Sequence, residues 1–461
     1  MDKKQKEIYQ KALELRNKRF KDIDKKGRLD SPRTKGSRGH IIEESHFGYS
    51  PNNNKEADFP DENLELKVTP IRKNRNGSFS SKERLVLNII DYHGEIKKAF
   101  YQSDFWKKNQ TLLLVFYLHE DEVAQELQMI KDVLMYDYPE EDFKIIRRDW
   151  DYIIRKIRRG EAHLLSESDT MYLGACPKGS SKKAGMVSQP NSKVPAMKRA
   201  YAFKQSYMTQ LVRKYVIGKE VNEKIFKDYA FLEKHSMEDE IQKRLKPFIG
   251  MKESEIREKF NITTKSKNKN EIYLSKMLGL ETKISKTEEF VKANIKPKTV
   301  RINYTGTITE SMSFSTFKYE DIIDEKWESS TLRDLFESTK FMFVIFKIDE
   351  YDQQIFQGVK FWRMPNHNLD YHVRLVWETT RELIQNGQII KSVSPTGKRT
   401  TYFPKMKDNP VSHVRPHARN ANDTYPLPVK DKLTGLDAFT KHCFWLNNHY
   451  IREQLSNFLK D

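Results

Sequence analysis

Asp58, Glu65 and Lys67 are the residues whose types and spacing are best suited to chemistry. Residues 63–69 alternate between polar and apolar side chains, which predicts a strand with Glu65 and Lys67 on one face. Asp58 precedes this strand at a predicted turn and can reach the same face. Two carboxylates, the Leu66 carbonyl, waters and a phosphate oxygen would form the all-oxygen octahedral site that Mg²⁺ prefers.

A metal ion in such a site stabilises charge that develops on phosphorus and lowers the pKa of a bound water. Lys67 could orient or deprotonate that water, or stabilise the anionic transition state. The alternative is a strand whose Glu and Lys side chains face only solvent, because this spacing also occurs by chance in lysine-rich chains. The spacing alone does not decide between the two, so the decision depends on the rest of the sequence.

The composition favours a polyanionic partner. The chain has 461 residues, a formal net charge of +18 and an isoelectric point of about 9.4, a balance that suits DNA, RNA or an anionic membrane. The length suggests two or three domains, and the 11% of aromatic residues argues against global disorder. No apolar run approaches the roughly 18–20 residues of a membrane span. The N-terminus resembles no signal segment, and two cysteines do not suggest a disulfide framework. We therefore expect a cytoplasmic protein with no membrane partner.

The second half of the chain repeats features of the first half in the same order. Three pairs of segments correspond, at offsets of 231, 227 and 243 residues. They are Gly48 and Asp58 with Gly279 and Glu289, Trp150 and Gly160 with Trp377 and Gly387, and residues 199–208 with 442–451. Three matches in the same order suggest a duplicated domain.

We therefore expect two domains of the α/β class (mixed α+β). Residues 218–251 are rich in charge and helical in pattern, which predicts a helical linker at 221–250 between domains at 1–220 and 251–461. A single solvated helix is predicted over residues 3–27. Each half then has strands, a helix, a long basic loop and a final strand or helix. This order favours a mixed central sheet flanked by helices over a bundle or a sandwich.

Several motifs along the chain resemble one nuclease family. They are residues 36–44 (GSRGHIIEE), 58–70 with its Glu-Leu-Lys-Val-Thr-Pro, 81–88 (SKERLVLN), 105–110 (FWKKNQ), 173–176 (LGAC) and 413–417 (HVRPH). In this order they resemble the MutH family of PD-(D/E)XK nucleases, in particular the two-domain type II restriction endonucleases that cut at GATC. The resemblance covers nearly the whole chain and implies two tandem MutH-like restriction-endonuclease folds. It also implies that Asp58 and Glu65 bind a metal ion and that Lys67 is the catalytic lysine.

The family also carries an acidic residue on an upstream helix, and two neighbours compete for this role. Counting from Gly39 along the helix favours Glu43, whereas counting back from Asp58 favours Glu44. Length changes fall more readily in loops than in helices, so the sequence favours Glu43.

A further family lysine lies shortly before a later strand, predicted here at residues 111–117. Lys108 is the candidate and Lys107 its rival, and a lysine at this place could also contact only solvent.

The second copy departs from the first at the predicted metal site. At the offset of 231 residues, Glu289, Lys296 and Lys298 replace Asp58, Glu65 and Lys67, and Leu274 and Ser275 replace Glu43 and Glu44. A lysine in place of the central carboxylate removes a metal ligand and adds a positive charge. The resemblance implies that the C-terminal domain is an inactive copy, which binds a second DNA site and activates the first domain.

Two basic segments are predicted to hold DNA. Residues 171–218 contain no acidic side chain, and the candidates there are Lys178, Lys182, Lys183, Lys198 and Arg199. In the second half, the resemblance to the family implies DNA contact by His413, Arg415 and His417. Phosphate contacts and base contacts cannot be separated at this stage. A zinc site at the two histidines is disfavoured, because Pro416 interrupts them and no further ligand lies at a suitable spacing.

The sequence thus predicts an Mg²⁺-dependent type II restriction endonuclease that acts on double-stranded DNA, at GATC, in the bacterial cytoplasm. Two alternatives remain at this stage: a mismatch-repair nicking enzyme of the same fold, and a non-catalytic DNA-binding regulator. The second domain argues against the first alternative. The loss of the acidic residues from only one half argues against the second. A monomer that binds two sites, or that dimerises on DNA, is compatible with the family.

Overall fold

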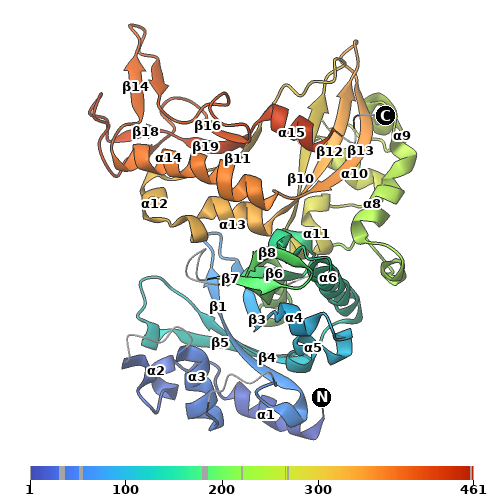
Figure 1. Ribbon diagram of the computed structural model, residues 1–461, viewed down its shortest axis with the longest axis vertical. Helices are drawn as coiled ribbons and strands as arrows, with labels where there is room; N and C mark the ends of the chain where they lie inside the picture. Colours follow the sequence, from blue (N-terminus) through green and yellow to red (C-terminus); the bar gives the residue numbers. More distant parts are fainter. Residues whose placement is uncertain are drawn as a thin grey trace. The chain divides into compact units, whose positions relative to one another are not determined.

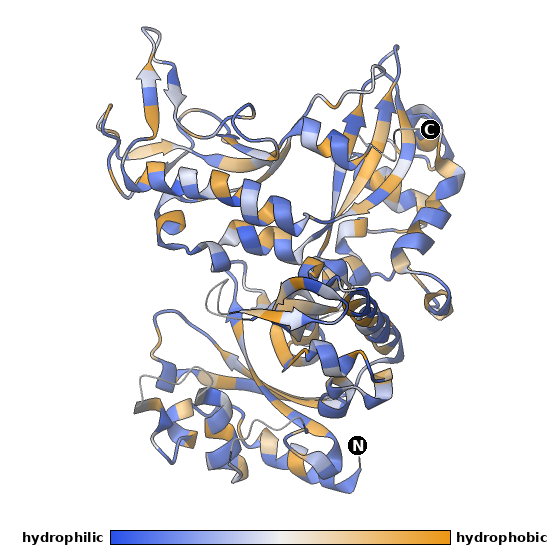
Figure 2. Ribbon diagram, viewed as in Figure 1, coloured by the Kyte–Doolittle hydropathy of each residue, from blue (hydrophilic) through white to orange (hydrophobic). Residues whose placement is uncertain are grey.

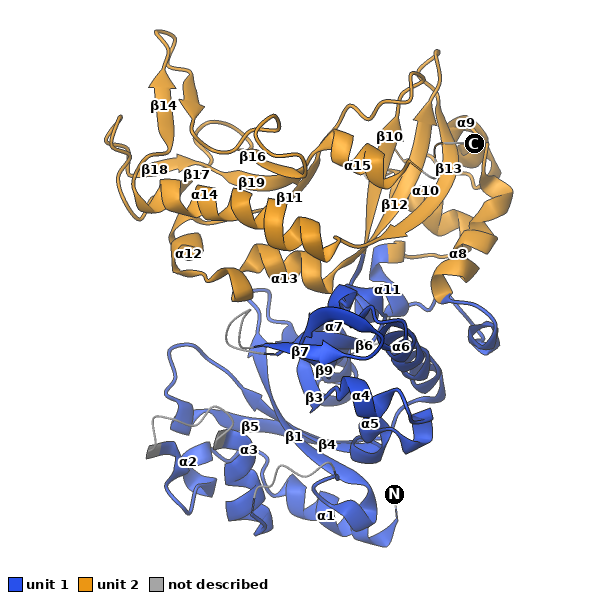
Figure 3. Cartoon of the chain, in the orientation of Figure 1, with its two compact units in different colours: residues 1–236, 285–295 blue, residues 237–284, 296–461 orange. Residues whose placement is uncertain are grey.

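The computed structural model describes residues 2–30, 37–50, 56–178, 185–219, 222–264, 266, 269–456 and 459. The chain forms two compact units (Figure 3). Unit 1 comprises residues 1–236 and 285–295, and unit 2 comprises residues 237–284 and 296–461. Unit 1 therefore extends beyond the predicted boundary at residue 220, and it also includes a short segment from later in the chain.

The N-terminal segment is not the single solvated helix that the sequence predicted. Helix α1 (Lys3–Leu13) ends early, and α2 (Phe20–Ile23) is one turn. Leu15 and Phe20 are fully buried and belong to a cluster with Leu64 and Leu113. Burial of these side chains stabilises the fold more than a continuous surface helix would.

The first sheet of unit 1 positions the predicted catalytic strand. Its order is β2 (Phe79–Ser81), β1 (Leu64–Lys73), β4 (Thr111–Leu118) and β5 (Met129–Tyr136) (Figure 1). Strand β1 pairs in parallel with β4, and Glu65 lies opposite Leu112. After Thr111, strand β4 is hydrophobic and almost entirely buried, as expected of a central strand covered on both faces.

A second sheet completes unit 1, in the order β3 (Leu85–Ile89), β9 (Arg199–Phe203) and β6 (Leu173–Pro177). A hairpin of β7 (Met186–Gln189) and β8 (Ser192–Met197) precedes β9. The helices are α3 (Ser37–Ile41), which continues as a π-helical turn over Ile42–Phe47, α4 (Tyr92–Glu95), α5 (Asp104–Lys108), α6 (Glu140–Arg158) and α7 (Gln205–Leu211). The indole of Trp150, in the middle of α6, is buried.

The segment 285–295 is bound to unit 1 through buried charges on helix α11 (Glu288–Ala293). The Lys292 ammonium lies 2.7 Å from Asp142 and 2.6 Å from Glu288. Breaking a buried pair of this kind is strongly destabilising, because it leaves an uncompensated charge. This explains why the chain returns to unit 1 before entering the strands of unit 2.

Unit 2 contains two sheets of three strands each. One has the order β10 (Ile295–Ile302), β12 (Lys340–Ile348) and β13 (Gln354–Trp362), and the other has the order β11 (Met312–Thr316), β19 (His442–Leu446) and β16 (Ser412–Pro416). Two hairpins are formed by β14 (Ile390–Val393) with β15 (Arg399–Thr401), and by β17 (Thr424–Pro426) with β18 (Ala438–Thr440).

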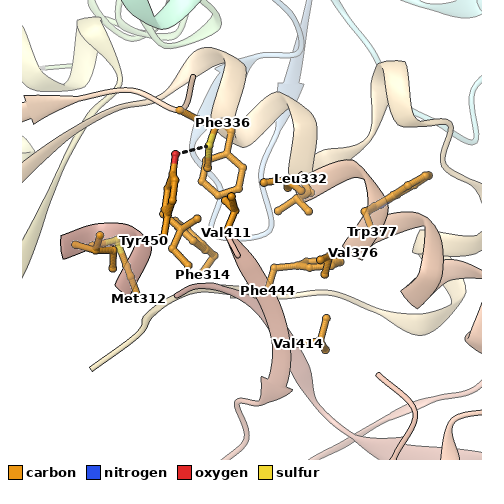
Figure 4. Packing of buried hydrophobic residues seen from close by; sticks show 14 of the residues in the cluster. Met312, Phe314, Leu332, Phe336, Val376, Trp377, Val411, Val414, Phe444 and Tyr450 are labelled. Atoms are coloured by element: carbon orange, nitrogen blue, oxygen red, sulfur yellow. Dashed lines mark hydrogen bonds between the residues drawn. The ribbon is translucent and has the colours of Figure 1, made fainter. Parts of the chain in front are cut away.

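The helices of unit 2 are α8 (Met237–Leu245), α9 (Glu253–Lys259), α10 (Lys269–Met277), α12 (Tyr319–Asp324), α13 (Thr331–Ser338), α14 (Arg374–Gln385) and α15 (Asn448–Gln454). Hydrophobic residues concentrate along the strands, whereas the helices carry many hydrophilic residues (Figure 2). In the core, Phe314 and Phe336 meet edge to face with ring centroids 5.0 Å apart, and Tyr450 lies beside them (Figure 4). Among the described residues, no helix is long and apolar enough to cross a membrane.

The two units repeat one plan. The strand order β1–β4–β5 corresponds to β10–β12–β13, and β3–β9–β6 corresponds to β11–β19–β16. Asn63 and Asn294, which precede β1 and β10, both have a positive φ, at 51° and 54°. Gly160 and Gly387 also share a positive φ, and a Cβ on either would lie 2.5 Å from a backbone carbonyl oxygen. Repeated special conformations at matching places explain two of the three offsets in the sequence.

The offset of 231 residues fails at one position. A constant shift places Glu289 opposite Asp58, but Glu289 lies on α11 and is buried in unit 1. Its carboxylate accepts hydrogen bonds from the N–H groups of Ile225 (3.0 Å) and Phe226 (3.2 Å) and from the Tyr229 hydroxyl (2.7 Å). Glu289 is therefore a structural residue that anchors the segment 225–229.

Candidate active site

A tight turn brings Asp58 onto the first residues of β1. Phe59 and Leu64 exchange backbone hydrogen bonds of 2.9 and 3.1 Å across a 3₁₀ turn at Pro60–Glu62. The left-handed conformation of Asn63 closes this turn, which suits asparagine better than most residues. As a result, the Asp58 carboxylate accepts a hydrogen bond of 2.9 Å from the Leu66 N–H.

Glu65 lies at the centre of the site. One carboxylate oxygen accepts a hydrogen bond of 3.1 Å from the Asp58 N–H. The other oxygen lies 2.6 Å from the Lys67 ammonium and 3.6 Å from the Lys108 ammonium. Glu65 is only 2% exposed, and burial raises the pKa of its carboxyl although the neighbouring lysines oppose this. The spacing argument thus correctly placed Glu65 and Lys67 together.

Lys108, and not Lys107, reaches this centre. It lies at the end of α5, and its ammonium also donates a hydrogen bond of 3.1 Å to the Glu56 carbonyl. Lys107 is exposed. Helix α5 begins at a Ser103 cap, whose side chain accepts a hydrogen bond from the Trp106 N–H. The cap fixes where the helix begins and therefore which lysine faces Glu65.

Glu43 and Glu44 have different surroundings. Glu44 pairs with Arg28, with 2.7 Å between a guanidinium nitrogen and a carboxylate oxygen, and this hydrogen bond lowers the pKa of Glu44. The pKa of Glu43 is raised to about 7, first by burial and then by the negative charges of Asp58 and Glu65. Glu43 therefore belongs to the electrostatic environment of the candidate site, whereas Glu44 faces a structural partner.

Tyr49 is a neighbour of the site that the sequence did not reveal. Its hydroxyl is buried and has no hydrogen-bond partner among the described residues. Burial raises the pKa of Tyr49, and the charges of Asp58, Glu43 and Glu65 raise it further. No spacing or charge pattern marks this tyrosine, whose ring packs against Phe59 with 5.3 Å between the ring centroids.

The donor set fits a hard divalent cation that keeps part of its water shell. Asp58 and Glu65 supply two carboxylates, and the Leu66 carbonyl follows Glu65 directly in the chain. Within the part of the chain that the structure describes, no group of three or more His, Cys, Asp or Glu side chains forms a complete metal site.

The predicted DNA-contacting residues of unit 1 fall into three groups. Lys178 and Lys198 lie at the neck of the basic loop, where the Lys178 N–H donates a hydrogen bond of 2.7 Å to the Lys198 carbonyl. Lys182 and Lys183 lie outside the described residues. Arg199 is only 4% exposed and donates a hydrogen bond of 2.6 Å to the Ala175 carbonyl. Because every residue of β9 is buried, Arg199 is not placed to contact DNA.

The corresponding residues of unit 2 also differ from one another. His413 is 2% exposed, its Nδ1 lies 2.5 Å from the Asn447 side-chain oxygen, and burial lowers its pKa. It is a core residue and is not placed to contact DNA. Arg415 and His417 are exposed. Both lie against Trp445, with the Arg415 guanidinium 5.0 Å from the ring centroid. The sequence did not single out this tryptophan.

Both cysteines are buried and unpaired with each other. Burial raises the pKa of the Cys176 thiol, which keeps it protonated at neutral pH. This agrees with a packing role on β6 and not with a nucleophile.

Comparison with known proteins identifies the family of this chain. The family model for the DNA mismatch repair enzyme MutH matches residues 47–149, a range that includes Asp58, Glu65, Lys67 and Lys108. The type II restriction enzyme Sau3AI of Staphylococcus aureus is 34% identical over 448 residues, which cover 90% of this chain and 91% of the relative. The chain belongs to the MutH-like type II restriction endonucleases. It is a site-specific deoxyribonuclease, and enzymes of this family generally depend on a divalent metal ion.

Proposed function

We propose that unit 1 uses Mg²⁺ to hydrolyse phosphodiester bonds in double-stranded DNA at GATC and leaves 5′-phosphate ends. The observation that carries this proposal is the convergence of Asp58, Glu65 and two lysine ammonium groups at the start of β1. Asp58 and Glu65, with the Leu66 carbonyl, would hold the metal ion. When bound, Mg²⁺ would neutralise charge on the phosphate and lower the pKa of a bound water.

The two lysines have different places in this scheme. Lys67 follows Glu65 by two residues on the same strand face and lies 2.6 Å from its carboxylate. It can donate a hydrogen bond to the attacking water or to a non-bridging phosphate oxygen. Lys108 is 3.6 Å from the same carboxylate and is held by the Glu56 carbonyl. Its fixed positive charge would stabilise the transition state without moving a proton.

Glu43 would act beside the metal ligands. Burial and the negative charges of Asp58 and Glu65 raise the pKa of Glu43, so its carboxyl belongs to the surroundings of both proposed ligands. We propose that Glu43, and not Glu44, is the acidic residue of the upstream helix that supports the metal site.

Unit 2 would bind a second GATC site as an effector without cutting it. The replacement of Glu65 by Lys296 removes a ligand from the corresponding place, and Arg415, His417 and Trp445 offer an exposed basic and aromatic surface. The chain would be a monomer that binds two sites or that dimerises on DNA. We place this activity in the cytoplasm of a bacterium, where the DNA substrate is found.

Incubation with plasmid DNA tests the proposal. Plasmids with GATC sites should be linearised or fragmented in Mg²⁺, whereas EDTA or the absence of GATC should leave them intact. Persistent cutting in EDTA would contradict the metal site, and cutting without GATC would contradict the specificity. Accumulation of nicked circles alone would favour the mismatch-repair type of enzyme, and binding without any cleavage would favour a regulator.

A further inference from the structure

The place in unit 2 that corresponds to the metal site carries two lysines on one strand. Strands β1 and β10 each begin directly after an asparagine with positive φ. Aligning these asparagines places Lys296 opposite Glu65 and Lys298 opposite Lys67. Both lysines are two residues apart in an extended strand, so their side chains leave the same face.

The charge balance at this place is the reverse of that in unit 1. Glu65 is an anion shared by Lys67 and Lys108. In the described part of unit 2, neither Lys296 nor Lys298 forms an ion pair. Burial lowers the pKa of Lys296, and the Asp334 carboxylate only partly opposes this. Two cations therefore share one face of β10 without an anion between them.

Lys298 is held in position by its surroundings. Its ammonium donates a hydrogen bond of 3.2 Å to the Ser313 carbonyl and lies 5.4 Å from the Phe314 ring centroid. Burial lowers the pKa of Lys298, and the positive charge of Lys296 lowers it further. The ammonium is thus fixed at a place where positive charge is unfavourable until an anion arrives.

The pair also lies close to the exposed basic surface of unit 2. Ser313, whose carbonyl binds Lys298, pairs with Trp445 between β11 and β19. Trp445 is the residue whose ring the Arg415 guanidinium contacts. Two neighbouring strands therefore connect the lysine pair with the residues expected to contact DNA.

We propose that Lys296 and Lys298 form a phosphate-binding site for the DNA backbone that needs no metal ion. It would take the phosphodiester group at the place where unit 1 binds its metal ion and the scissile phosphate. This inference rests on the proposed DNA-binding role of unit 2. Replacement of the Glu65 carboxylate by Lys296 then does more than remove a metal ligand, because it converts the site into a permanent anchor for an uncut phosphate.

The test is a titration of the full chain in EDTA with a short duplex that carries one GATC site. Wild type should bind two duplexes, one per unit. In the Lys296→Gln/Lys298→Gln variant, one of the two dissociation constants should rise on the order of tenfold. The salt dependence of that binding step should fall by about one ion, as expected when one phosphate contact is lost.

Four controls make the result specific. Lys347→Gln removes an exposed lysine from β12 and should leave both dissociation constants unchanged. Lys296→Arg/Lys298→Arg keeps both charges and should retain binding. Thermal unfolding of each variant checks that the fold is preserved. In the Asp58→Ala background, where DNA stays uncut, addition of Mg²⁺ should not change the affected binding step.

The outcomes separate this inference from the proposed function. If wild type binds one duplex only, the second-site role of unit 2 fails. If wild type binds two and the Gln double variant binds both with unchanged affinity, that role stands but the phosphate site is wrong. An equal loss of affinity in the Lys347→Gln variant would also overturn the proposed phosphate site, since the loss would then reflect the total positive charge of unit 2.

Discussion

Strands β1 and β10 begin in the same way, but they carry opposite charges at the position that decides the chemistry. In unit 1 this position is Glu65, which is buried and shared by Lys67 and Lys108. In unit 2 it is Lys296, which has no ion pair within the described residues. A duplicated fold can therefore keep its strand order and its special turns while one copy exchanges a buried glutamate for a lysine. The scaffold and the chemistry are specified by different residues.

The largest expected effect comes from removing Asp58, one of the two carboxylates proposed to hold the metal ion. Asp58→Ala should lower cleavage of GATC plasmids at least about 1,000-fold, because a metal ion contributes several kcal/mol to the transition state and about 1.4 kcal/mol corresponds to a factor of ten. Binding of a GATC duplex in EDTA should be retained. Cleavage by the variant at near wild-type rates would show that Asp58 does not hold the metal ion.

The lysines of unit 1 should have graded effects. Lys67→Met should lower the cleavage rate by about 100-fold, as expected for loss of a group that contacts the reacting atoms. Lys108→Met should have a smaller effect, because its ammonium lies 3.6 Å from Glu65 whereas that of Lys67 lies 2.6 Å away. Lys107→Met is the matched control and should cut like wild type. Single-turnover rates measure all three, and a stronger effect of Lys107 than of Lys108 would contradict the placement of α5.

Glu43 and Glu44 offer a comparison of adjacent residues. Glu43→Gln should weaken the response to Mg²⁺ by about 10- to 100-fold, in the range seen for groups that support metal ligands. Glu44→Gln should leave the Mg²⁺ response unchanged, since this carboxylate binds Arg28. The measurement is the cleavage rate as a function of Mg²⁺ concentration. A larger change in the Mg²⁺ dependence for Glu44→Gln would show that Glu44, and not Glu43, is the acidic residue that the family carries on this helix.

The two units should also differ in acid stability. Strand β9 begins with Arg199, which remains charged, whereas β19 begins with the buried His442. Burial lowers the pKa of His442 to about 4. The unfolded state therefore binds more protons between pH 6.5 and 4, and the stability of unit 2 falls by about 3 kcal/mol as the pH is lowered through this range. Above about pH 6.5, His442 is neutral in the folded and the unfolded state, so this loss of stability is absent.

Hydrogen exchange of the β19 amides at pH 7 and near pH 4.5 measures this difference. His442→Gln should remove most of the pH dependence in β19 and leave that of β9 unchanged. If the variant keeps the wild-type slope, another group is responsible for the acid sensitivity of unit 2.

The sequence predicted the local geometry of the site well, because this geometry depends on residues that are neighbours in the chain. The alternation of residues 63–69 predicted β1, and the spacing of Glu65 and Lys67 placed them on one face. Tyr49 and Trp445 were missed, since their positions depend on loop folding and on strand pairing across long separations. Arg199 and His413 were misjudged, because their charge suggested DNA whereas β9 and β16 place both side chains in the interior.

The duplicated halves show a similar limit of sequence patterns. A constant offset correctly relates Lys296 to Glu65, because both are counted from the same asparagine turn. It fails for Glu289, because the residues before that turn form the helix α11 in one half and a loop in the other. An offset is reliable only along elements that both copies share.

The central claim is that one carboxylate decides which unit cuts, and a reciprocal exchange at the two strands tests it most directly. Glu65→Lys and Lys296→Glu are compared in the full chain by plasmid cleavage in Mg²⁺ at saturating DNA. Glu65→Lys should abolish cutting, whereas Lys296→Glu should still cut, with at most a weakened dependence on the second site. Equal loss of cleavage in both variants would contradict the assignment of catalysis to unit 1.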